Sequence, residues 1–174
     1  MLFRSYAFFF RTATPESHPE LWKTLLNDFG PARSKTRKYP EIASSNAFIG
    51  NFLRLECLAR EGYSAKILEE TRDFFLYMAD LTGTLWENTH HHASCNHGFA
   101  SHVVVFLVRD MLGLREIDYI SKTVRFDPPK NLELNRISMR VPVSGTEFID
   151  ASWEKKADGS INEKIVLPEG WKRK

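Results

Sequence analysis

The 174-residue sequence predicts an α+β protein, with helical hairpins in its first part and an antiparallel β-sheet in its second. In several segments between residues 17 and 112, apolar residues recur at every third or fourth position, which is typical of amphipathic helices. Between residues 137 and 167, apolar and polar residues alternate, which is typical of strands with one buried face. We therefore predict a helical domain at residues 1–114 and a strand-containing domain at residues 115–174.

The first helices are marked by an aromatic run and by a start signal. The run Tyr6-Ala7-Phe8-Phe9-Phe10 is expected to end a buried helix. The run Ser17-His18-Pro19-Glu20 reads as a capping box with a proline in the first turn, so it predicts the start of a second helix. Gly30-Pro31 is expected to end that helix.

Three further helices are expected. Residues 45–60 carry a wide apolar stripe, which predicts a largely buried helix. Residues 64–81 place Ile67, Phe74, Met78 and Leu81 on one face, and they place Lys66, Glu69, Glu70, Arg72 and Asp73 on the other, solvated face. Residues 99–112 predict a buried helix ending at Gly113, because the apolar stretch is long for a strand. This alternation of inner and outer helices suits a barrel of helical hairpins.

The second part reads as four strands. We expect strands at residues 123–126, 137–144, 149–153 and 161–167, with Asp158-Gly159 as a hairpin turn. Pro142 predicts an edge position for its strand, because proline cannot donate to a sheet ladder. Four strands alone make a marginal sheet, so this domain is expected to be incomplete.

Composition and charge exclude several classes of function. The net charge of +2 is too small for a nucleic-acid-binding surface, and no apolar run reaches the length of a membrane span. The two cysteines, Cys57 and Cys95, do not make a disulfide framework. The apolar residues 2–10 lack a following cleavage site, so they are not read as a signal peptide.

The loop at residues 82–98 holds the candidate chemistry: one carboxylate, four histidines, a tryptophan and a cysteine. Glu87 follows Trp86, whose indole would partly desolvate it and suit it to acid–base work. A structural alternative is a glutamate that is hydrogen-bonded to nearby backbone N–H groups. Trp86 and Phe48 are candidates for stacking on a sugar ring, and core packing is the alternative for both.

His97 is expected in or beside the first turn of the following helix, where the positive helix end disfavours the imidazolium form. A neutral histidine there could donate a hydrogen bond to a substrate hydroxyl, and a buried histidine satisfied by backbone is the alternative.

A metal site in the same loop is the rival interpretation. Zinc-ligand types occur at His90, His91, His92, Cys95 and His97. Their spacing matches no zinc motif, so no metal and no cofactor is predicted. A non-enzymatic metal-binding module remains the alternative function.

Two runs in this loop resemble a known enzyme family. Thr84-Leu85-Trp86-Glu87 and the following run from Ser94 to Ser101 resemble the C-terminal part of bacterial family 78 glycoside hydrolases, the α-L-rhamnosidases. Residues 45–54 also look like the inner helix that precedes this motif in the family, and residues 137–170 resemble its C-terminal β-sandwich. The likeness spans about residues 43–170.

The resemblance implies a specific fold and reaction. It implies the last hairpins of an (α/α)₆ barrel followed by an incomplete antiparallel β-sandwich. It implies an inverting hydrolysis of terminal α-L-rhamnose from glycans or glycosides, in which Glu87 is the general base and His97 contacts the sugar. Trp86 and Phe48 would line the pocket. A related barrel hydrolase acting on another sugar is an alternative.

The same resemblance implies that part of the machinery lies elsewhere in the polypeptide. The family's general acid is a glutamate well upstream, so this chain is expected to be a C-terminal fragment that is inactive alone and completed by the missing N-terminal part. The expected partner is a carbohydrate substrate. The location is left open, with a periplasmic or extracellular one favoured over a cytoplasmic one, and any signal would lie upstream.

Overall fold

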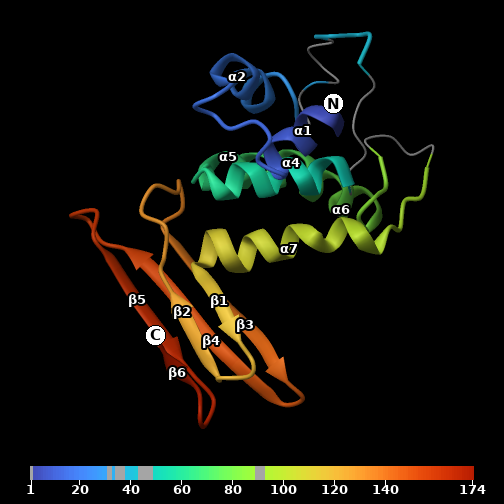
Figure 1. The fold of residues 1–174 in the computed structure, drawn as a ribbon. Coiled ribbons are helices and arrows are strands. Elements are labelled where there is room, and N and C mark those ends of the chain that lie inside the picture. The colour runs from blue at the N-terminus through green and yellow to red at the C-terminus, as the bar shows by residue number, and fades with distance from the viewer. Residues whose placement is uncertain (1, 31–32, 34–37, 43–48, 89–92) are drawn as a thin grey trace. The chain divides into compact units, whose positions relative to one another are not determined.

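The computed structural model describes residues 2–30, 33, 38–42, 49–88 and 93–174, and it shows a mixed α and β protein (Figure 1). The predicted α+β class is confirmed at this level. The chain divides into two compact units, residues 1–103 and residues 104–174. The predicted domain boundary, between residues 114 and 115, lies later in the chain and stays a prediction.

The first unit is helical. Among the described residues, its elements are α1 (Leu2–Phe9), α2 (Pro19–Asn27), α4 (Ile49–Arg60), α5 (Ser64–Glu70), the π-helical segment η1 (Thr71–Leu76), α6 (Tyr77–Thr82) and the 3₁₀-helix η2 (Gly98–His102). The core includes side chains from most of these elements: Phe8, Trp22, Leu25, Leu53, Leu55, Leu58, Ile67, Phe74, Phe75 and Met78. Apolar residues at helical spacing therefore build this unit, as the sequence predicts.

The start of α2 differs from the predicted capping box. The residue at the N-cap is His18, and its side chain makes no capping hydrogen bond. The Ser17 hydroxyl instead accepts a hydrogen bond from the Thr14 N–H at 2.9 Å, in the preceding turn. The predicted capping box is therefore wrong, because its serine is engaged on the other side, whereas Pro19 does stand in the first turn.

The segment predicted as one outer helix, residues 64–81, is continuous but contains the π-helical turn η1. An extra residue per turn shifts the helical phase, so the adjacent Phe74 and Phe75 are both buried. Leu81 lies beyond the shift and is 60% exposed, although it is predicted on the buried face. Glu70 is predicted on the solvated face but is only 6% exposed. The predicted positions of Leu81 and Glu70 are therefore both wrong.

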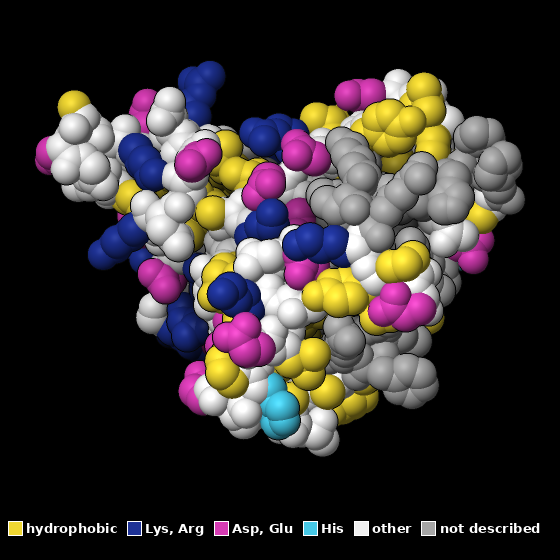
Figure 2. Space-filling view, turned by 90° about the horizontal axis from the view of Figure 1, so that it is seen from above, with side chains coloured by type: hydrophobic (Ala, Val, Ile, Leu, Met, Phe, Trp, Pro, Cys, Tyr) yellow, Lys and Arg dark blue, Asp and Glu magenta, His cyan; other side chains and the backbone are white. Residues whose placement is uncertain are grey.

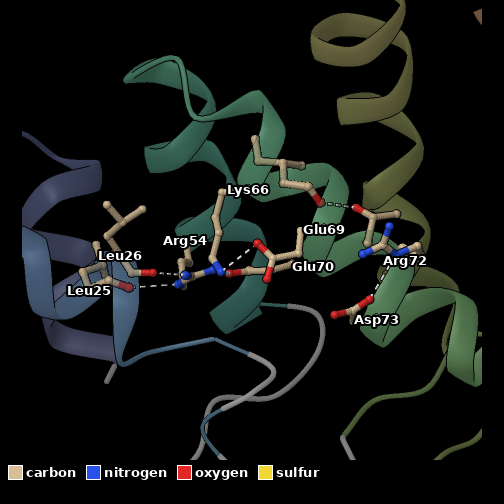
Figure 3. Close-up of polar contacts among 10 residues, drawn as sticks. Leu25, Leu26, Arg54, Lys66, Glu69, Glu70, Arg72 and Asp73 are labelled. Atoms are coloured by element: carbon tan, nitrogen blue, oxygen red, sulfur yellow. Dashed lines mark hydrogen bonds and ion pairs between the residues drawn. The ribbon is translucent and has the colours of Figure 1, made fainter. Parts of the chain in front are cut away.

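A buried ion pair explains the position of Glu70 and joins three helices. Arg54 of α4 is fully buried, and its Nη1 donates to a carboxylate oxygen of Glu70 at the end of α5 (Figure 3). Its Nε donates to the Leu25 carbonyl at 3.1 Å, and its Nη2 donates to the Leu26 carbonyl at 3.0 Å. These carbonyls lie in the last turn of α2, where helical carbonyls have no partner inside the helix.

The helix that follows η2 consists of α7 (Val103–Phe106) and the π-helical segment η3 (Leu107–Leu112). The second unit begins at Val104, the second residue of α7. The predicted helix at residues 99–112 is confirmed as helical. It is buried on one face only, since Phe99, Val104 and Val105 are each more than half exposed. It ends at Gly113, whose φ of +93° is favoured for glycine.

Two three-stranded sheets complete this unit. The strands are β1 (Leu114–Asp118), β2 (Thr123–Phe126), β3 (Arg136–Ser144), β4 (Glu147–Lys155), β5 (Ile161–Val166) and β6 (Lys172–Arg173). One sheet has the order β1-β2-β6, with β2 and β6 parallel, and the other has the antiparallel order β3-β4-β5. Pro142 lies on the edge strand β3, as predicted, whereas β1 and β6 are not predicted.

Trp153 of β4 connects the β3-β4-β5 sheet to the π-helical segment η3. Its side chain is buried, and its Nε1 donates to the Met111 carbonyl at 3.1 Å. The segment η3 packs against β1, β3 and β4. Leu112, Leu114 and Val124 are also buried in this unit.

Basic and acidic side chains are interspersed on the face drawn in Figure 2. Among the residues that the structure describes, none of the helices combines the length and the apolar character that a membrane crossing needs.

Replacing Arg54 with methionine is expected to destabilise the protein by about 3–5 kcal/mol, because a buried carboxylate and two helix-terminal carbonyls lose their partner. Urea unfolding followed by circular dichroism measures this change. The double variant Arg54→Met/Glu70→Leu should recover part of the loss, since it no longer buries an unpaired charge. A single variant as stable as the parent would contradict the role assigned to Arg54.

The destabilisation by Arg54→Met should also depend on pH. Burial raises the pKa of Glu70, and Arg54 opposes this effect. Without Arg54, the folded-state pKa lies further above the unfolded value, so the stability of the variant should fall as pH rises from about 4 to about 7. Each unit of difference corresponds to about 1.4 kcal/mol. Unfolding curves across this range test the sign, and a variant that gains stability relative to the parent would contradict it.

Candidate functional site

The loop between α6 and η2 carries the candidate chemistry, and two backbone hydrogen bonds hold its described arms together. The Glu87 N–H donates to the Ser94 carbonyl at 2.9 Å, and the His97 N–H donates to the Leu85 carbonyl at 2.8 Å. The Thr84 hydroxyl also donates to the Cys95 carbonyl. Residues 85–88 and 93–97 therefore form two facing arms, one carrying Glu87 and the other His97.

Trp86 anchors the first arm in the core. It is 1% exposed, and its indole Nε1 donates to the Thr82 hydroxyl oxygen at 2.8 Å. Its backbone N–H lies 3.4 Å from the Met78 sulfur, and its ring packs edge-on against Tyr77. The structure thus places Trp86 as a core residue that fixes the loop, and its predicted contact with a sugar stays a prediction.

Glu87 is half-buried beside this anchor. Within the part of the chain that the structure describes, its carboxylate makes no hydrogen bond and no ion pair with another side chain or with the backbone. The structural alternative, in which nearby backbone N–H groups bind the carboxylate, is therefore not seen. A half-buried carboxylate on a fixed backbone is available to accept a proton or a hydrogen bond from a ligand.

His97 stands at the N-cap of η2, with φ −118° and ψ 97°, so it lies at the first turn of the following helix, as predicted. Its imidazole does not cap that helix, and its carbonyl accepts the Ala100 N–H at 3.0 Å. The side chain is half-buried. The start of η2 and the backbone hydrogen bond to Leu85 together fix the backbone of His97, from which the imidazole extends.

The remaining candidates are only partly covered. Phe48, His90, His91 and His92 lie outside the described residues. Cys95 is a half-buried free thiol whose sulfur lies 3.7 Å from the Ala93 carbonyl. Over the described ranges, no group of three or more His, Cys, Asp or Glu side chains is arranged to hold a metal ion.

The structure adds His102, which the sequence does not single out. Its ring contacts Phe52, Phe75 and Phe99 at centroid distances of 5.5, 5.8 and 6.3 Å. Its Nδ1 lies 3.0 Å from the Phe99 carbonyl, and burial lowers the pKa of this histidine. A histidine inside an otherwise apolar stretch, three positions after Phe99, is the signal that could have drawn attention to it.

Thr82 is also a site-forming residue that the sequence reading missed. Its hydroxyl oxygen accepts the indole N–H of Trp86, lies 2.8 Å from the Thr84 hydroxyl and donates to the Met78 carbonyl at 3.2 Å. The run Thr82-Gly83-Thr84 at the end of a helix is the sequence signal that could have indicated Thr82 as a residue that anchors the loop.

We expect Thr82→Val to destabilise the loop by about 1–3 kcal/mol, because the buried indole N–H of Trp86 loses its acceptor. Amide hydrogen exchange at Glu87 and His97 should accelerate, and urea unfolding gives the global change. Thr71→Val is the matched control, since its hydroxyl makes the same bond to a carbonyl four residues earlier, Ile67 at 2.8 Å, and binds no indole. Equal effects of both variants would contradict the anchoring role.

Comparisons of the chain with protein-family models, with curated proteins and with solved structures find no match. The predicted resemblance to α-L-rhamnosidases, which is based on the runs around Trp86-Glu87 and Asn96-His97-Gly98, stays a prediction.

Proposed function

We propose that this chain is the C-terminal part of an inverting glycoside hydrolase that releases terminal α-L-rhamnose, with Glu87 as the general base. The observation that carries the proposal is the state of Glu87: a half-buried carboxylate without a partner among the described residues, next to the buried anchor Trp86. A glutamate that only faces solvent would not need a neighbouring residue buried in the core to fix its backbone. The resemblance of the surrounding sequence to rhamnosidases supplies the substrate class.

The proposed reaction uses two carboxyl groups. Glu87 accepts a proton from a water molecule as the water oxygen bonds to the anomeric carbon. The bond from that carbon to the glycosidic oxygen breaks, and a general acid upstream of this chain protonates the departing oxygen. In inverting enzymes the two carboxyl groups stand about 6.5–9.5 Å apart, which leaves room for the water. His97, on the facing arm, would orient the sugar through a hydroxyl.

The proposal also includes the architecture of the two units, a helical barrel and a β-sandwich. The helical hairpins of residues 1–103 would contribute to an (α/α)₆ barrel, and the two sheets of residues 104–174 would belong to a β-sandwich. The general acid and most of the pocket that selects the sugar would come from the N-terminal part of the same polypeptide. Two observations support this proposal: the first unit is helical, and strands follow it in the second unit.

In the polypeptide that includes the upstream part, Glu87→Gln should lower the turnover of an aryl α-L-rhamnoside by roughly 10²–10⁴-fold, because the amide cannot accept the proton of the attacking water. Binding of L-rhamnose should change little, since the amide keeps the shape of the side chain and one of its two acceptor oxygens. Release of the aryl group measures turnover, and calorimetry measures binding.

Asp80→Asn is the matched control for this variant. It neutralises an exposed carboxylate on α6, close in sequence to the same loop, and should leave turnover unchanged. Proton NMR of the sugar first released by the parent should show the inverted anomer. Near-normal turnover in the Glu87→Gln variant, or a product with retained configuration, would rule out the proposed role of Glu87.

A further inference from the structure

A cavity of about 200 Å³ lies in the first unit, far along the sequence from the loop that carries Glu87. Its apolar wall consists of Phe8 from α1, Ala13 from the turn after it and Trp22 from α2, all of them buried. The Phe8 and Trp22 rings meet edge to face at 5.1 Å. Cys57 of α4 also lines the cavity.

The Cys57 thiol behaves as an apolar part of this wall. It is buried, its sulfur lies 3.8 Å from the Ser5 carbonyl, and burial raises its pKa to about 11. A thiol with such a pKa stays protonated near neutral pH and packs as a small hydrophobic group. The inner part of the cavity is therefore aromatic and uncharged.

The mouth of the cavity, in contrast, carries both signs of charge. Arg11 and Arg60 supply two guanidinium groups, and Glu16 and Glu61 supply two carboxylates. Arg60 is held in place, because its Nη1 donates to the Phe9 carbonyl at 2.9 Å and its guanidinium lies 5.4 Å from the centre of the Phe9 ring. That hydrogen bond uses one of five guanidinium donors. A hydrogen bond from the Thr14 side chain lowers the pKa of Glu16, which keeps this carboxylate charged.

The turn that forms the mouth is fixed by local hydrogen bonds. The Arg11 N–H donates to the Phe8 carbonyl at 3.2 Å, and the Ala13 N–H donates to the Ala7 carbonyl at 3.1 Å. Arg11 has a φ of +60°, in the left-handed region, and it lies in the turn that follows α1. The cavity is thus formed before any ligand arrives, as is usual for small-molecule sites.

We propose that this cavity binds a free amino acid with an aromatic side chain. The size fits, because a cavity of about 150 Å³ accommodates one benzene ring, and 200 Å³ leaves room for a short polar group beside it. The ring would lie against Phe8 and Trp22. The ligand carboxylate would meet Arg11 and Arg60, and its ammonium would meet Glu16 and Glu61. This site is separate from the proposed hydrolase chemistry and does not depend on it.

Titration of the chain with L-phenylalanine, followed by NMR of labelled protein, tests the site. The amide signals of Ala13 and Cys57 and the indole signal of Trp22 should shift, while those of Glu87 and His97 should not. Phenylacetate lacks the ammonium group, phenethylamine lacks the carboxylate and L-alanine lacks the ring, so each should bind at least tenfold more weakly. Equal shifts with L-alanine, or shifts confined to other residues, would overturn the proposal.

Arg11→Gln should weaken the binding of L-phenylalanine about tenfold, because the carboxylate loses a charged donor. Arg72→Gln is the matched control, since it removes an exposed arginine from η1 and should leave the affinity unchanged. Ala13→Leu should fill the cavity and abolish binding, and circular dichroism shows whether that variant is folded. Failure of L-phenylalanine to bind the folded parent chain at millimolar concentration would also overturn the proposal.

Discussion

The helical unit depends on one buried guanidinium. Arg54 contacts the end of α2 through the carbonyls of Leu25 and Leu26, and it contacts the end of α5 through Glu70 (Figure 3). The backbone closes tightly over this group at Gly30, where a Cβ would lie 3.1 Å from both Arg54 and Glu70. Its φ of +148° is a further reason for glycine at this position. A buried charge is tolerated only when it is paired and hydrogen-bonded, and Arg54 meets this condition with three partners.

The ion pair and the candidate site lie on the same helical run. Glu70 ends α5, and η1 and α6 continue from it without a break to Thr82. Met78 and Thr82 then provide the contacts that hold Trp86. Because this run is fixed to Arg54 at Glu70 and its end is fixed to the indole, the backbone of Glu87 is positioned by the core of the unit. The loop thus owes its geometry to contacts made well before it in the chain.

Local sequence patterns predict the regular elements of this protein well and the tertiary exceptions poorly. The helices near residues 64–81 and 99–112, the strands around residues 137–167 and the edge position of Pro142 all follow from periodicity and from backbone chemistry. The burial of Glu70 does not, because its partner Arg54 lies on another helix and the local pattern shows only a charged face. The π turns also escape prediction, since a period of 3.6 contains no signal for an inserted residue. The short strands β1 and β6 depend on pairing with β2, which no local pattern reveals.

The same distinction applies within the candidate loop. That Glu87 and His97 share one loop is evident from the sequence, but the pairing of its two arms requires the backbone hydrogen bonds from Glu87 to Ser94 and from His97 to Leu85. The sequence leaves open whether Trp86 faces a ligand or the core. The structure shows that its indole is buried and its N–H is bound, so burying Trp86 is what fixes the backbone of its neighbour. The backbone of Glu87 is therefore fixed, while its carboxylate has no hydrogen-bond partner among the described residues, and the proposed role as a general base would use these free acceptor oxygens.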